Sequence, residues 1–164
     1  MSKEINCKLK AQCSLENLRR ALLKIMPDWE KYLLMDEAGG LAQYGYQGDV
    51  RHETGYSIII PGPQHKLPNG KNASYPADRS SDNDWGFVLA AGSGDSSQWK
   101  FTAAEFNQHK AKQLENDVSV EIAKLQTHQL HAELGYQDEE LVVGDEIYID
   151  ALVPIEDIPQ SELA

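Results

Sequence analysis

The amino-acid sequence predicts an α+β domain, with a mostly antiparallel sheet of five or six strands and two helices on one face of that sheet. Several short segments show strand patterns, either alternating or rich in β-branched residues, and turn residues separate them. Two segments show the three- and four-residue spacing of amphipathic helices. We expect one domain over residues 1–153, followed by an acidic flexible tail over residues 154–164.

The first strand is expected over residues 4–13, where "INCKLKAQC" alternates apolar and polar side chains. Such a strand would hold Cys7 and Cys13 roughly 20 Å apart, too far for a disulfide. The first helix should follow Ser14, a favourable N-cap, and should end at Pro27. Its apolar face would consist of Leu15, Leu18, Leu22 and Ile25.

The middle of the chain reads as strands around one long polar loop. "KYLLM" predicts a short strand, and "LAQYGYQGDVRHETGYSIII" predicts two more. The second of these ends in Tyr56–Ile60, which is apolar on both faces and should be central in the sheet. Residues 61–84 are rich in Pro, Gly, Asn and Ser, which indicates either a flexible flap or a small hairpin turning at Asn69-Gly70. "DWGFVLAA" predicts the next strand.

The second helix is expected to begin at Thr102, because "TAAE" has the pattern of a capping box. Gly135 is placed to end this helix as its C′ residue. An unbroken helix of that length would span about 50 Å, so we expect a break near "ENDVS". "ELVVGDEIYIDALV" then predicts a hairpin around Gly144-Asp145.

Two opposite sides of the second helix carry apolar side chains. The inner stripe, expected on the sheet, consists of Leu114, Val118, Ile122, Leu125, Gln129, Ala132 and Tyr136. The opposite side, here called the outer flank, consists of Val120, Ala123, Thr127, Leu130 and Leu134. Its spacing is that of a short heptad repeat. We expect another part of the chain, a second copy in a homo-oligomer, or a protein partner to cover the outer flank.

His128 and His131, in "LQTHQLHAELGYQ", raise the question of a metal site. Neighbouring residues one turn away are poor ligands, and Lys124 would bring a positive charge toward the ion. The two histidines are therefore interpreted as side chains near a helix C-terminus, where the helix dipole favours their protonated form. We predict no metal and no cofactor.

No sequence motif indicates a catalytic residue. "AAGSGD" lacks the Lys-Ser/Thr of a phosphate-binding loop, and no G-x-S-x-G elbow is present. Neither Cys7 nor Cys13 has a basic activator nearby in the sequence. We therefore expect a protein that is not an enzyme.

The charge distribution is acidic and uneven. The net charge is −11, and residues 134–164 hold nine acidic residues and no Lys or Arg. Nucleic-acid binding depends on cationic contacts with phosphate, so we expect no nucleic-acid partner. No apolar run reaches the roughly 20 residues of a membrane span, and "MSKEINCKLK" does not have the pattern of a signal peptide. We expect no membrane partner and a cytoplasmic location.

Four segments carry a resemblance to a known family. They are "INCKLKAQCSLENLRRAL", "YGYQGDVRHETGYSIII", the "DW" at Asp84-Trp85, and "HQLHAELGYQDEELVVGDEIYIDALV". In this order they resemble the domain-of-unknown-function family numbered twelve fifty-seven, which includes a chloroplast and cyanobacterial reading frame. The resemblance implies a compact α+β domain with an accessory role, since some relatives occur beside AAA-type ATPases. It implies no catalytic residue.

Three functional hypotheses follow. The first is a non-enzymatic accessory or regulatory protein that binds another protein through the outer flank. The second is a small-ligand binder or enzyme with a pocket under residues 61–84, lined by Tyr56, Tyr75 and Trp85. The third is an acidic charge mimic that inhibits a nucleic-acid-binding protein.

Overall fold

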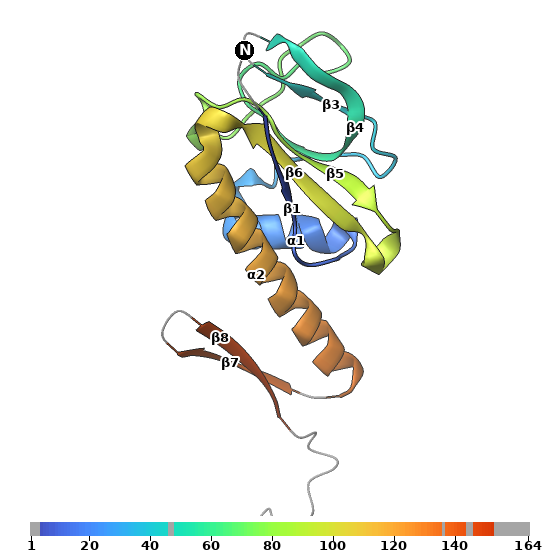
Figure 1. Ribbon diagram of the computed structural model, residues 1–164, viewed down its shortest axis with the longest axis vertical. Coiled ribbons are helices and arrows are strands. Elements are labelled where there is room, and N and C mark those ends of the chain that lie inside the picture. Colours follow the sequence, from blue (N-terminus) through green and yellow to red (C-terminus); the bar gives the residue numbers. More distant parts are fainter. Residues whose placement is uncertain (1–3, 46–47, 136, 144–145, 153–164) are drawn as a thin grey trace, which may run out of the picture. The chain divides into compact units, whose positions relative to one another are not determined.

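A computed structural model describes residues 4–45, 48–135, 137–143 and 146–152 (Figure 1). It confirms the predicted α+β class, with a six-stranded antiparallel sheet and two α-helices. The chain divides into two compact units, Met1–Ile122 and Ala123–Ala164. Helix α2 (Gln108–Glu133) runs across the boundary between them. The boundaries 1–153 stay a prediction, and the tail expected over 154–164 lies outside the described residues.

The main sheet has the strand order β1-β6-β5-β4-β2, with β3 also paired to β4 (Figure 1). The strands are β1 (Glu4–Lys8), β2 (Leu34–Met35), β3 (Leu41–Tyr44), β4 (Val50–Ile60), β5 (Trp85–Ala91) and β6 (Gln98–Ala104). Every pairing is antiparallel. The buried end of β4 lies between β5 and β2, which confirms a central position for Ile58–Ile60.

Helix α1 (Leu15–Ile25) begins and ends where the sequence predicts. The Ser14 hydroxyl accepts a hydrogen bond from the backbone N–H of Asn17 at 3.1 Å. Pro27 then opens the 3₁₀ helix η1 (Pro27–Trp29). The first strand is shorter than predicted: β1 ends at Lys8 and does not extend to Cys13. The backbone N–H of Cys13 donates to the carbonyl of Ser97, outside the paired strands. Both cysteines are free.

The predicted start of the second helix is wrong. Thr102 lies in β6, where it pairs with Asn6 on one side and Gly86 on the other. Its buried hydroxyl forms hydrogen bonds with Tyr56 and Gln43 and does not cap a helix. Helix α2 begins only at Gln108, after the 3₁₀ helix η5 (Glu105–Asn107). The expected break is also absent, since α2 is continuous through Asp117.

The end of α2 is as predicted. Gly135 has a φ of 77°, the left-handed conformation that ends many helices. Its backbone N–H donates to the carbonyl of Ala132. The predicted hairpin follows as β7 (Gln137–Val143) and β8 (Glu146–Leu152), which pair with each other as a separate two-stranded sheet. The predicted turn at Gly144-Asp145 lies outside the described residues.

Both helices pack on one face of the main sheet. Trp29, directly after α1, makes an edge-to-face contact with Trp85 of β5. Trp85 in turn contacts Phe101 of β6. Cys7 is paired with Phe101, and burial together with Glu115 of α2 raises the pKa of its thiol. This face therefore holds the aromatic core.

The opposite face of the sheet carries a closed hydrogen-bond triangle. The Tyr56 hydroxyl donates to the Gln43 side-chain oxygen at 3.0 Å. The Gln43 amide donates to the Thr102 hydroxyl at 2.9 Å, and that hydroxyl donates to Tyr56 at 3.0 Å. All three side chains are buried. Because every member has a partner, the triangle can lie in the interior without an unpaired polar group.

Candidate functional site

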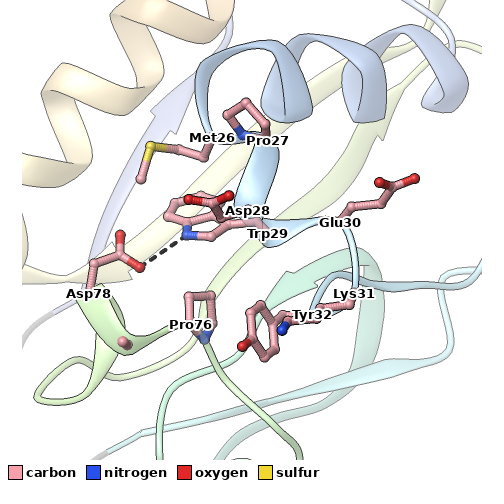
Figure 2. Close-up of a pocket in the computed structure, with 10 residues that line it drawn as sticks. Met26, Pro27, Asp28, Trp29, Glu30, Lys31, Tyr32, Pro76 and Asp78 are labelled. Carbon is pink, nitrogen blue, oxygen red and sulfur yellow. Dashed lines mark hydrogen bonds between the residues drawn. The ribbon is translucent and has the colours of Figure 1, made fainter.

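A pocket of about 710 Å³ lies between the segment after α1 and the 61–84 loop (Figure 2). Its lining residues are Met26, Pro27, Asp28, Trp29, Glu30, Lys31, Tyr32, Pro76, Ala77 and Asp78. This volume falls within the range of sites that bind small molecules or short peptide segments.

Trp29 forms the wall of the pocket and is held from two sides. Its indole N–H donates to the Asp78 carboxylate at 3.1 Å, the dashed contact in Figure 2. Its ring meets Trp85 edge-to-face, with centroids 6.3 Å apart. The residue is only 3% exposed. Pro76 is also buried, so this wall is apolar and firmly positioned.

Acidic side chains outnumber basic ones around the pocket. Asp28, Glu30 and Asp78 are exposed carboxylates, against the single cation Lys31. Glu30 forms an exposed ion pair with Arg19 at 3.8 Å. Lys31 lies over the Tyr32 ring, with its ammonium 5.0 Å from the centroid. The opening therefore has negative character next to an aromatic and proline wall.

A buried guanidinium supports the pocket from inside. Arg79, directly after the pocket residue Asp78, is 1% exposed and stacks over the Trp85 ring at 3.5 Å. It donates to the Asp82 carboxylate at 2.8 Å and to the carbonyl of Asn83. Burial lowers the pKa of Arg79 to about 10, although the nearby carboxylates oppose this effect. Arg79 is therefore charged at neutral pH, and Asp82 compensates that charge directly.

Asp84 anchors the other end of the 61–84 loop. Its carboxylate accepts hydrogen bonds from the backbone N–H groups of Gly62 and Tyr44, each at 2.9 Å. It also contacts Nδ1 of His65. Both His65 and Asp84 are almost fully buried, and the His65 ring packs edge-to-face on Tyr44. We interpret this His-Asp pair as a structural contact that fastens the loop.

The 61–84 loop contains a small hairpin over residues 65–73, the second of the two predicted alternatives. Lys66 and Asn72 form a β-bridge, and Gly70 has a φ of 82° at the predicted turn. The 3₁₀ helix η3 (Ala77–Arg79) follows and contributes to the pocket.

The structure does not bring the predicted ligand-binding residues together. Tyr56 lies on the sheet face with Gln43 and Thr102. Trp85 is 4% exposed and lies on the other face, behind Trp29. Tyr75 is 36% exposed and is not among the residues that line the pocket. Local sequence patterns identify Pro27 only as a helix stop and do not indicate the pocket, although "PDWEKY" combines proline, two aromatic residues and acids.

The outer flank of α2 is exposed at its large apolar side chains. Val120, Leu130 and Leu134 are 38%, 54% and 59% exposed. Ala123 is also exposed, and Thr127 is half-buried, with its hydroxyl donating to the carbonyl of Ala123 at 2.9 Å. On the inner stripe, Leu114, Val118 and Ile122 are buried. Leu125 and Gln129 are half-buried, and Ala132 is exposed. The side chain of Tyr136 lies outside the described residues.

His128 and His131 lie half-buried near the end of α2. Among the residues that the structure describes, no group of three or more His, Cys, Asp or Glu side chains is arranged to hold a metal ion. Within the same residues, no helix combines the length and the apolar character that crossing a membrane requires.

Comparison with protein-family models, with curated proteins and with solved structures finds no match to this chain. The resemblance to the domain-of-unknown-function family twelve fifty-seven stays a prediction.

Proposed function

We propose that this protein is a non-enzymatic accessory protein that binds another protein through the outer flank of α2. The observation that carries the proposal is the exposure of Leu130 and Leu134, 54% and 59%, on one side of a continuous helix. Large apolar side chains that recur along one exposed flank are typical of protein-binding surfaces. The opposite, inner stripe is buried at Leu114, Val118 and Ile122, so the outer flank is not needed for that core contact.

The partner we propose is an amphipathic helix of a basic protein. The outer flank has the three-four-three-four spacing of a heptad seam, which accepts apolar side chains of a facing helix. The chain carries a net charge of −11. Two copies of such a chain repel each other, whereas a basic partner is attracted. The same charge disfavours nucleic acid as the partner.

The test uses a synthetic helical peptide with Leu at heptad positions a and d and Lys at e and g. We expect it to bind the protein in isothermal titration calorimetry. The double substitution Leu130→Lys/Leu134→Lys should weaken binding at least about tenfold, because each leucine loses an apolar contact. The matched control is Val50→Lys/Leu89→Lys, which changes two exposed apolar residues of the main sheet to the same charge.

Two outcomes would contradict the proposal. One is equal affinity of the peptide for the parent protein and for the Leu130→Lys/Leu134→Lys variant. The other is a stable dimer in light scattering that this variant dissociates, since the outer flank would then bind a second copy. Affinity purification would then identify the natural partner. Its two baits are the Leu130→Lys/Leu134→Lys variant and the control variant Val50→Lys/Leu89→Lys.

A further inference from the structure

The pocket beside Trp29 has a chemistry that the outer flank of α2 does not share. Its wall is made of Trp29, Pro76 and Tyr32, and three carboxylates lie around it against one lysine. All of its residues belong to the unit Met1–Ile122, and none belongs to the outer flank. It is therefore a second, separate candidate site.

The electrostatics of the pocket select a cation. Asp28 and Asp78 are exposed. The nearby buried cation Arg79 is paired with Asp82 at 2.8 Å and also interacts with the charges of Asp84 and Asp78. Lys31 is positioned over the Tyr32 ring, and Arg19 lies 3.8 Å from Glu30. Asp28 and Asp78 keep an excess of negative charge, which repels phosphates and carboxylates and attracts cationic groups.

The shape and the lining select a cation with an apolar stem. Arginine and lysine place a long aliphatic stem on apolar surface and keep the charged head near water or carboxylates. Guanidinium groups also stack on aromatic rings, as Arg79 does on Trp85 in this structure. The volume of about 710 Å³ exceeds that of one side chain and has room for a short peptide segment.

We propose that this pocket binds an arginine side chain in an extended basic segment of a partner protein. The aliphatic stem packs on the accessible apolar lining residues Met26 and Pro27, beside the Trp29 wall, and the guanidinium lies near Asp28 and Asp78. Asp78 already accepts from the Trp29 indole at 3.1 Å, so the wall and the charge are held together before the ligand arrives. Such preorganisation lowers the entropic cost of binding.

The experiment measures binding of a capped pentapeptide with a central arginine, followed through the indole N–H resonance of Trp29 and by calorimetry. The comparison peptide carries citrulline, which is neutral and has nearly the same shape. We expect the arginine peptide to shift the Trp29 resonance and the citrulline peptide to bind at least about tenfold more weakly, because a charge-assisted contact is lost.

Substitution of the two carboxylates tests the site itself. Asp28→Asn/Asp78→Asn removes two charges, and the amide oxygen introduced at position 78 can still accept from the Trp29 indole. We expect this double variant to bind the arginine peptide about tenfold more weakly. The matched control Glu53→Gln/Asp95→Asn removes two exposed charges that do not line the pocket, and it should leave the affinity unchanged. If the double variant fails to fold, Asp28→Asn alone, at an exposed position, serves in its place.

Three results would overturn the proposal. The first is equal binding of the arginine and citrulline peptides. The second is unchanged affinity of the carboxylate variant. The third is binding of free agmatine as tightly as the peptide, which would assign the pocket to a small amine. The Leu130→Lys/Leu134→Lys variant should bind the arginine peptide normally, so failure of this site and failure of the α2 surface are distinguishable.

Discussion

Hydrogen bonds of single side chains hold the 61–84 loop on the sheet, and the Asp84 carboxylate forms several of them. Its carboxylate is 1% exposed and accepts from two backbone N–H groups that lie far apart in the sequence, those of Tyr44 and Gly62. Buried backbone donors without an acceptor are costly, so one side chain keeps two segments of the fold in place.

Asp84→Ala should therefore lower the free energy of unfolding by about 3–5 kcal/mol, since it leaves both backbone donors and His65 without this acceptor. Urea unfolding at neutral pH would measure the loss. Asp95→Ala, at an exposed position, should change stability by less than about 0.5 kcal/mol. A loss below about 1 kcal/mol for Asp84→Ala would show that the network does not hold the loop.

Helix α2 is the element with two different sides. Ala111, Leu114, Val118 and Ile122 are buried, whereas Val120, Leu130 and Leu134 are exposed. The apolar pattern on the two sides is similar in the sequence, so only burial distinguishes a core contact from a surface available to a partner.

Substitutions on the two sides of α2 should have different effects on stability. Ile122→Ala should cost about 2–4 kcal/mol, because it leaves a cavity in a fully buried site. Leu130→Ala, at a side chain that is 54% exposed, should cost less than about 1 kcal/mol. Urea unfolding of the two variants would measure this contrast. Equal losses would mean that Leu130 also belongs to a core.

Over the whole molecule, alkaline pH acts on groups that folding buries. Burial raises the pKa of Cys13 to about 12 from an ordinary value of 9.0, and that of Tyr56 to about 12 from 10.0. The unfolded chain loses the Cys13 proton above about pH 9 and the Tyr56 proton above about pH 10, while the folded protein keeps both. Rising pH therefore favours unfolding, first through Cys13 and then also through Tyr56.

Unfolding measured from pH 8 to 10.5 should show stability falling with pH, by up to about 1.4 kcal/mol per pH unit for each titrating group. Cys13→Ala should reduce this slope between pH 9 and 10, even though the variant is less stable throughout. The comparison variant Cys7→Ala removes a half-buried thiol whose pKa burial and Glu115 also raise, so it should reduce the slope as well. An unchanged slope in Cys13→Ala would exclude Cys13 as the cause.

Local sequence patterns were sufficient to predict where helices end and which fold class the chain adopts. The Ser14 cap, the stop at Pro27 and the turn at Gly135 each depend on neighbours within one helical turn, so a short window of sequence contains the physical cause. Alternation and β-branched runs likewise identified the strands, because a half-buried strand repeats every two residues.

Contacts between residues distant in the sequence determined the features that local patterns could not predict. "TAAE" satisfies a capping pattern, yet Thr102 is a strand residue because Asn6 and Gly86 pair with it from both sides. The pocket joins Trp29 to Asp78, two positions whose proximity depends on the path of the 61–84 loop. The burial of Ile122 depends in the same way on which side of α2 packs within the unit Met1–Ile122. Pairing and packing between distant residues are properties of the folded chain, and a local window does not contain them.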